Sequence, residues 1–318
     1  MEQIFQYIYQ VYEEGSFSKA AEKLYITQPA LSIAIQKEEA SIGMPLFDRT
    51  QRPLRLTPMG KIYIHTIKKA QYLDRELSEQ INDIRNLNAG NIRIGGTHYL
   101  NAYILPEVLA GFSKKYPKIN VELVESGSDN LMDMLYEKKI DLTFNCNPQF
   151  LPDFKCHPAF HDTILLAVPE SYQIHERLKG AALSFADIRK EMHLEADCPT
   201  VSIEEFQSVE FILLSKGNNL YDRSLKLFQQ AGFEPHIKMS LSQLVTSYHL
   251  AEHGIAAAFV SDRLITGQIS KASSNLQFYK INSELLYRQF YIMLPKKDYT
   301  SFATEKFIDY FANLMKHR

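Results

Sequence analysis

The sequence predicts an α/β protein of several domains: an all-helical N-terminal domain with a small β-wing, a long helix, and two α/β lobes. Three observations carry this prediction. At 318 residues the chain exceeds what one ordinary hydrophobic core organises. Before Gly90, apolar side chains recur at helical spacing, and no glycine interrupts the stretch that follows Gly60. Beyond Gly90, short strands alternate with helices, which is typical of βαβ units.

Composition limits the classes of partner. No apolar run reaches the roughly 18 residues that a membrane-spanning helix needs, so we expect no membrane partner. The N-terminus, MEQIFQYIYQVYEEG, is amphipathic and acidic and lacks a basic region or a cleavage site, so we expect a cytoplasmic protein. Because 35 basic residues nearly balance 37 acidic ones, any basic surface for a nucleic acid must be local.

The cysteines predict no metal site. Cys146, Cys156 and Cys198 form no CxxC pair, and their spacing fits neither a zinc site nor a secreted disulfide framework. We therefore expect three unreactive thiols, no metal ligands and no cofactor. A thiol redox sensor stays open as an alternative, with Cys146 and Cys156 as the near pair.

The first residues predict two short helices. Apolar residues recur at helical spacing from Ile4 to Tyr12, and Gly15 ends this helix. Ser16 or Ser18 can cap the next helix, SKAAEKLY, whose paired alanines allow close helix approach.

A third helix follows, with Thr27 as its cap and Pro29 in its first turn, where a missing N–H costs nothing. One face is mainly apolar, and the other carries Gln28, Ser32, Ile33, Gln36 and Lys37. Glutamine and serine side chains can bond base edges in the major groove, and Ile33 and Pro29 can contact thymine methyl groups. Three helices of this kind predict a helix-turn-helix.

The stretch MPLFDRTQRPLRLTPMG predicts a β-wing. Its extended pieces, PLFDR and PLRLT, would place Arg49, Arg52 and Arg55 against phosphates or in the minor groove. The alternative for the helix and the wing alike is an ordinary solvated surface.

The ordered set GSFSKAAEKLYITQPALS…IGMPLFDRTQRPLRLTPMG resembles the winged helix-turn-helix of the LysR-type transcriptional regulators, without a gap from Gly15 to Gly60. The resemblance implies double-stranded DNA with a pseudo-palindromic operator as partner. It implies DNA contacts by Ser16, Ser18, Thr27, Gln28, Pro29, Ser32, Ile33, Gln36, Arg49, Arg52 and Arg55. Two residues depart from the family pattern: Ile33 replaces a basic or polar residue, and Glu38 replaces an apolar one. Glu38 suggests different packing of the helix or a nearby cation.

The long helix predicted over residues 58–88 carries an apolar seam at three- and four-residue steps, namely Ala70, Leu73, Leu77, Ile81, Ile84 and Asn88. By pattern alone it could pack on its own domain. The resemblance implies instead a linker helix that joins a homodimer or homotetramer.

The C-terminal two thirds predict a largely parallel sheet, with strands at NIRIGG, INVELVES and IDLTFNC before a second set of strands and helices. Two such lobes resemble the periplasmic-binding-protein architecture, which the LysR family uses as its effector domain. We therefore expect a DNA-binding domain at 1–58, a linker helix at 59–89 and an effector-binding domain at 90–318. Within the last, lobe I would take 90–165 and 267–318, and lobe II 166–266.

Polar residues that follow the strands are candidates for effector contacts, because strand ends and helix N-termini meet in the cleft of such folds. By the resemblance they are Thr97, His98, Ser126, Ser128, Asn145, Asn147, Ser215 and Asn218. Hydroxyls and amides favour a small anion such as a carboxylate, and His98 could add charge near neutral pH. The alternative is that they only form turns and caps.

These features predict a ligand-responsive DNA-binding regulator, for which promoter activation would add RNA polymerase as a partner. A solute-binding protein without a regulatory role is the alternative, opposed by the winged N-terminus. GxSxG, HExxH, Walker and GxGxxG motifs are absent from the sequence, so we expect no enzyme and no catalytic residues.

Overall fold

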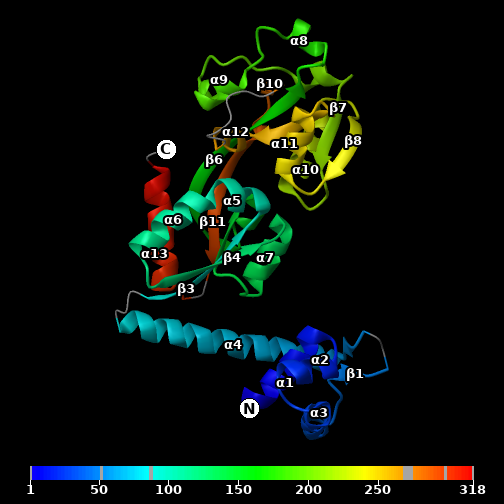
Figure 1. The fold of residues 1–318 in the computed structure, drawn as a ribbon, viewed down its shortest axis with the longest axis vertical. Coiled ribbons are helices and arrows are strands. Elements are labelled where there is room, and N and C mark those ends of the chain that lie inside the picture. The colour runs from blue at the N-terminus through cyan, green and yellow to red at the C-terminus, as the bar shows by residue number, and fades with distance from the viewer. Residues whose placement is uncertain (1, 51–52, 86–88, 268–274, 297–298, 317–318) are drawn as a thin grey trace. The chain divides into compact units, whose positions relative to one another are not determined.

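The computed structural model describes residues 2–50, 53–85, 89–267, 275–296 and 299–316 (Figure 1). The chain divides into two compact units, Met1–Ile81 and Asn82–Arg318. Each unit is described by itself. Within the described ranges, no helix is long and apolar enough to cross a membrane.

The first unit is a winged helix-turn-helix, as predicted. Its elements are α1 (Glu2–Glu14), α2 (Phe17–Lys23), α3 (Gln28–Ile42), β1 (Phe47–Asp48), β2 (Arg55–Leu56) and the start of α4 (Pro58–Ile84). The wing is an antiparallel pair in which Phe47 faces Leu56. Buried apolar residues from every helix form one core, including Ile8, Val11, Ala20, Leu31, Ile35, Leu46 and Ile64.

Gly60 explains part of the LTPMG motif. A Cβ placed on Gly60 would lie 2.0 Å from the carbonyl oxygen of Leu46, so only glycine lets α4 pass this close to the wing. Thr57 strengthens the same junction, because its hydroxyl donates to the carbonyl of Pro45 at 2.6 Å and accepts from the amide of Gly60 at 2.9 Å. The wing is therefore held against the base of α4.

The apolar seam of α4 is partly exposed. Ile64 and Ile67 are buried in the core of the first unit. Farther along, Leu73, Leu77 and Ile84 are 63%, 56% and 81% exposed. The seam beyond Ile67 is thus left open to solvent within the single chain.

The second unit is built on one sheet with the order β4-β3-β5-β11-β6-β9-β7-β8, and β10 pairs with β6. The strands are β3 (Gly90–Gly96), β4 (Ile119–Glu125), β5 (Leu142–Asn145), β6 (Phe154–Pro169), β7 (Glu210–Leu214), β8 (His236–Leu241), β9 (Ala257–Ser261), β10 (Leu276–Tyr279) and β11 (Tyr287–Pro295). Strands β3, β4 and β5 run parallel in one half, and β7, β8 and β9 run parallel in the other. We call these halves lobe I and lobe II.

Two long antiparallel strands, β6 and β11, join the lobes (Figure 1). Both have runs of buried apolar residues, which explains why a single core extends through the two lobes. The connection back to lobe I differs in detail from the expectation. Strand β10 lies in the stretch assigned to lobe I, yet it pairs with the lobe II end of β6, with Leu276 opposite Pro169. The chain returns to lobe I only with β11.

Helices cover both lobes. Lobe I carries α5 (His98–Tyr103), α6 (Leu105–Lys115), α7 (Ser128–Tyr136), the 3-10 turn η1 (Pro148–Phe150) and α13 (Phe302–Met315). Lobe II carries α8 (Ile174–Arg177), α9 (Phe185–Arg189), η2 (Met192–Leu194), η3 (Ile203–Phe206), α10 (Asn219–Gln230), α11 (Leu244–Glu252) and α12 (Asp262–Thr266). The turn η4 (Glu284–Leu286) leads into β11.

Candidate DNA-binding surface and inter-lobe cavity

Helix α3 begins where the sequence predicts. The Thr27 hydroxyl accepts a hydrogen bond from the Ala30 amide at 3.4 Å, and Pro29 lies in the first turn. Leu31 and Ile35 are buried, so the helix is anchored by one side. The opposite face exposes Gln28, Pro29, Ile33 and Gln36, and Ile33 is 64% exposed. This face presents amide donors and acceptors beside an apolar side chain, the chemistry that reads base edges.

Helix α2 is capped by one of the two candidate serines. The Ser16 hydroxyl accepts from the Lys19 amide at 3.5 Å, whereas Ser18 lies within the helix and is exposed. Of the two, only Ser16 therefore acts as the cap.

Arg49 is exposed, and its side chain is bonded to α3. Its guanidinium donates to the Ser32 hydroxyl at 3.3 Å, forms an ion pair with Glu39 at 3.0 Å and lies 4.9 Å from the ring centroid of Phe17. Glu39 also accepts from the Leu46 amide at 2.7 Å. Arg49 and Glu39 thus connect the wing to α3.

Of the other two wing arginines, Arg55 is likewise exposed, on β2, and Arg52 lies outside the described residues. Glu38 packs against α4, where its carboxylate accepts a hydrogen bond from the hydroxyl of Tyr63 rather than meeting the cation that the sequence suggested. Burial raises the pKa of Tyr63, and Glu38 raises it further.

A small cavity of about 50 Å³ lies between lobe I and lobe II. Its wall includes four of the eight residues proposed as effector contacts: Thr97, Ser128, Asn145 and Asn218. The rest of the wall is Tyr99, Phe144, Cys146, Leu214, Asn219, Leu220, Leu244, Arg288 and Phe290. Residues from both lobes therefore meet at one place, and Ser128 crosses between them by donating to the carbonyl of Gly217 at 3.4 Å.

The other four candidates are not part of this wall. Each is bonded at its own turn or strand end: His98 to Glu125, Ser126 to Asn130, Asn147 to Gln149 and Ser215 to Leu241. The Asn147 side chain accepts from the Gln149 amide at 3.2 Å and so caps η1. The local bonds of Ser126 and Asn147 fit the alternative of turns and caps.

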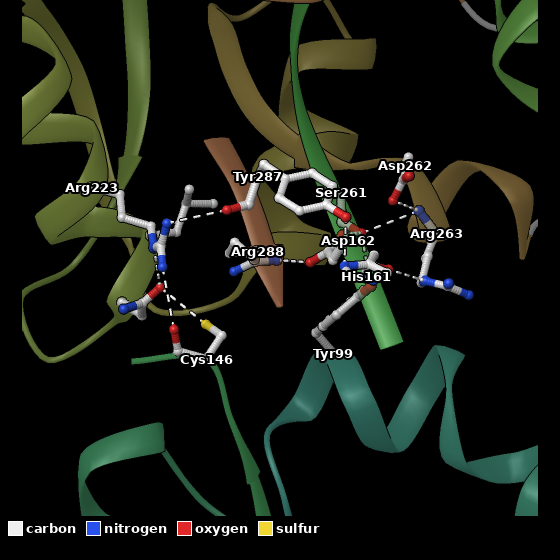
Figure 2. Close-up of polar contacts among 12 residues, drawn as sticks. Tyr99, Cys146, His161, Asp162, Arg223, Ser261, Asp262, Arg263, Tyr287 and Arg288 are labelled. Carbon is white, nitrogen blue, oxygen red and sulfur yellow. Dashed lines mark hydrogen bonds and ion pairs between the residues drawn. The ribbon is translucent and has the colours of Figure 1, made fainter. Parts of the chain in front are cut away.

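A buried ion pair beside the cavity was not predicted from the sequence. Asp162 on β6 and Arg288 on β11 face each other in register and form an ion pair (Figure 2). Asp162 is 0% and Arg288 5% exposed. Burial raises the pKa of Asp162, although Arg288 acts in the opposite direction. The sequence did offer one indication, because Arg288 stands in β11 at an alternate position shared with buried apolar residues.

A hydrogen-bonded chain extends from this pair. The Ser261 hydroxyl donates to Asp162 at 2.5 Å and lies 2.7 Å from the hydroxyl of Tyr99 (Figure 2). Tyr99 belongs to α5 of lobe I, and Ser261 ends β9 of lobe II. These hydrogen bonds therefore link the two lobes beside the cavity.

Arg223 supports the cavity wall from α10. Its Nε donates to Oδ1 of Asn219 at 2.6 Å, and its two terminal nitrogens donate to the carbonyls of Cys146 at 3.2 Å and Leu285 at 2.8 Å. All these acceptors are neutral. Burial lowers the pKa of Arg223.

The three thiols do not favour the redox alternative. Burial raises the pKa of Cys146, and it also raises the pKa of Cys156 and of Cys198. Since the thiolate is the reactive form, a raised pKa lowers reactivity. Cys146 instead donates to Oδ1 of Asn219 at 3.1 Å.

Comparisons with known proteins agree on one family. Residues 3–61 match the family described as "Bacterial regulatory helix-turn-helix protein, lysR family", and residues 85–316 match "LysR substrate binding domain". The chain is 29% identical over 255 residues to "Uncharacterized HTH-type transcriptional regulator YcgK" of Bacillus subtilis (strain 168), which covers 79% of this chain and 77% of the relative. It is 25% identical over 303 residues to "Probable RuBisCO transcriptional regulator" of Gracilaria tenuistipitata var. liui, covering 93% and 91%.

The fold has a full-length counterpart among solved structures. "Crystal structure of full-length CbnR complexed with the target DNA complex" superposes with a TM-score of 0.67 at 18% sequence identity, covering 98% of this chain and 99% of that one. At this identity the likeness concerns the fold.

Proposed function

We propose that this chain, which belongs to the LysR family of bacterial transcriptional regulators, binds a pseudo-palindromic operator and alters transcription when a small anionic metabolite occupies the inter-lobe cavity. The observation that carries the proposal is the cavity wall, which comes from both lobes. A ligand that bonds to both lobes at once favours one arrangement of them over others, and this difference in affinity drives the switch. The protein would act in the cytoplasm on bacterial DNA, and as an activator it would contact RNA polymerase.

The exposed face of α3 supports the DNA part of the proposal. Gln28 and Gln36 offer amide groups to base edges, and Ile33 offers an apolar contact to thymine methyl groups. Arg55 on the wing is free to approach a phosphate. Helix α3 would therefore read the sequence while the wing adds affinity.

Self-association through α4 supports a palindromic site. Leu73, Leu77, Ile81 and Ile84 follow one another at three- and four-residue steps, and all are exposed. An exposed apolar stripe on a long helix is covered in coiled-coil fashion by a second copy. Two copies would place two α3 helices on one duplex.

The α4 interface has a direct test. We expect Leu73→Asp with Leu77→Asp to convert the protein to a monomer at micromolar concentration in analytical ultracentrifugation, because two charges cannot be buried in an apolar seam. Gln71→Asp is the matched control, since Gln71 is exposed on α4 but off the stripe. An unchanged mass of the double variant would place self-association elsewhere.

Selection of sheared genomic fragments by the full-length protein tests DNA recognition. We expect enrichment of fragments that share an inverted repeat with half-sites about one helical turn apart or a multiple of it. A saturable mobility shift on an enriched fragment should survive excess random competitor. Enrichment without any shared motif would contradict sequence-specific recognition.

A further inference from the structure

An isoleucine occupies the crest of α3, the line along the helix that lies opposite its buried side. Leu31 and Ile35 anchor the buried side in the core of the first unit. Successive residues of an α-helix are turned by about 100°, so Ile33, midway between those two in sequence, points to the opposite side. Ile33 is 64% exposed. It therefore stands farthest from the core and would reach deepest into a groove that received α3.

The residues one turn away from Ile33 divide the crest into two parts. Pro29 and Ala30 lie one turn before it, Gln36 and Lys37 lie one turn after it, and all four are exposed. The side chains of Pro29 and Ala30 carry no hydrogen-bonding group, whereas those of Gln36 and Lys37 do. In a helix-turn-helix the N-terminal residues of the recognition helix contact the base edges. The part of the crest that would meet the bases first is thus apolar.

The hydroxyl of Ser32 does not change this character. Ser32 lies about 100° around the helix from Ile33, on the flank of the crest. It is half-buried and accepts a hydrogen bond from the Arg49 guanidinium at 3.3 Å. This hydroxyl is therefore engaged by the wing, and the crest at Ile33 keeps its apolar surface.

Folding gives no reason for an isoleucine at this position. Among the described residues of the first unit, the apolar core is formed without Ile33. A side chain branched at Cβ also lowers helix propensity slightly in comparison with glutamine or arginine. The contribution of Ile33 is therefore to be sought in what α3 binds.

The major groove offers one kind of apolar group. Base edges there present N7, O6 and O4 acceptors, amino donors and the C5 methyl group of thymine. An isoleucine pressed against an acceptor or a donor would displace its water without replacing the hydrogen bond, which costs affinity. Against a methyl group, the same side chain only removes apolar surface from water. Thymine and 5-methylcytosine are the pyrimidines that suit it, whereas uracil and cytosine lack the methyl group.

We infer that Ile33 reads the C5 methyl group of one pyrimidine in each half-site, so that the protein distinguishes thymine from uracil and 5-methylcytosine from cytosine. The inference rests on the proposed function, because it requires α3 in the major groove, and it adds a means of regulation. Methylation of a cytosine that faces Ile33 would strengthen binding without any change of base sequence.

The methyl group can be removed from the DNA without changing the protein. In an operator obtained by the genomic selection described above, each thymine of one half-site is replaced singly by uracil. The Kd of the full-length protein is then measured by fluorescence anisotropy. We expect one thymine at which the Kd rises about fourfold, the factor that corresponds to burial of one methyl group. Replacement in both half-sites should raise the Kd about sixteenfold, because distant contacts are additive in free energy.

Ile33→Ala identifies the side chain that makes the contact. In this variant the thymine and uracil operators should bind with nearly equal affinity, since the partner of the methyl group is gone. Ile62→Ala is the matched control, because Ile62 is 60% exposed in the same unit but lies on α4. It should keep the full discrimination. The measured quantity is the ratio of two Kd values for one variant, so a change in general DNA affinity cancels.

Cytosine and 5-methylcytosine at the same position give an independent measurement. Both pair with guanine, so the two operators differ by the methyl group alone. We expect wild type to bind the methylated operator about fourfold more tightly. Ile33→Ala should bind the two operators alike.

Three results would overturn the inference: a uracil scan with no responsive thymine, discrimination that Ile33→Ala retains in full, or equal binding of the cytosine and 5-methylcytosine operators by wild type. The proposed function fails in a different way. A protein that enriches no shared motif has no operator to scan, and that result removes both proposals. A shared motif together with a flat uracil scan removes only the reading by Ile33.

Discussion

The winged unit and the inter-lobe cavity are assembled from the sequence in opposite ways. In the winged unit, Thr27, Ile33 and Gln36 lie within one helix and its cap. In the cavity, Thr97, Asn218 and Arg288 come from three distant parts of the chain and meet through the pairing of the sheet. A surface made by one helix depends on local rules, whereas a cavity between lobes depends on tertiary register.

The two regions should therefore differ in the substitutions that they tolerate. The exposed face of α3 has few intramolecular partners, so its side chains can change with little effect on folding. The side chains around the cavity include Arg288, which connects β11 to β6 through Asp162. We therefore expect a change there to act on stability.

The largest expected effect follows from breaking the ion pair between β6 and β11. Arg288→Ala leaves Asp162 buried without its partner, and we expect a loss of about 3–5 kcal/mol in the free energy of unfolding. Native-state hydrogen exchange of the amides in β6 and β11 measures this loss locally, which is preferable in a chain of two units.

The companion variant Arg288→Met with Asp162→Leu removes both charges and should recover most of the stability. If Arg288→Ala lowered the free energy of unfolding by less than about 1 kcal/mol, Asp162 would be neutral or solvated. The cavity and the winged unit would then differ less in how strongly substitutions destabilise them.

The fold was largely predictable because its patterns are local. Helical spacing, the Thr27 cap and the glycine of LTPMG all indicate the winged unit, and the alternation of strands and helices indicates the lobes. The position of β10 was not predictable, since which strand pairs with the end of β6 is decided by packing over long sequence separations.

The cavity was predictable only in part. Thr97, Ser128, Asn145 and Asn218 reach its wall because they follow strands or begin helices, a rule that sequence can apply. His98 and Asn147 follow the same rule, but His98 bonds to Glu125 at the end of β4 and Asn147 bonds within its own turn. Arg288 obeys no motif, because its role depends on lying opposite Asp162 in the β6–β11 register. Arg49 was predicted to bind DNA, which stays a prediction, whereas its bonds to Ser32 and Glu39 on α3 were not predicted.

Two substitutions in the winged unit should have a smaller effect, on DNA binding alone. We expect Gln36→Ala to weaken binding to the operator by about 1–3 kcal/mol, because it removes a base-edge contact. Binding to random DNA should hardly change. Arg55→Ala should weaken binding to operator and to random DNA alike. It should also make the fall of log K with log salt concentration less steep, by about 1. Fluorescence anisotropy at three salt concentrations separates these results.

Both DNA variants should keep the wild-type free energy of unfolding. Equal loss on operator and random DNA in Gln36→Ala would show that Gln36 positions the helix without reading bases. A changed free energy of unfolding in either variant would mean that its side chain also stabilises the winged unit.

The smallest effect concerns the start of α2. The bond from the Lys19 amide to the Ser16 hydroxyl is long at 3.5 Å, so Ser16→Ala should cost about 0.5–1 kcal/mol, the lower part of the range for helix caps. Ser18→Ala is its matched control, because Ser18 is exposed within the same helix and removal of its hydroxyl should change little. Hydrogen exchange of the α2 amides should therefore accelerate several-fold in Ser16→Ala alone. Equal acceleration in both would mean that α2 is held by its buried alanines and not by its cap, so that even in the winged unit tertiary packing outweighs the local signal.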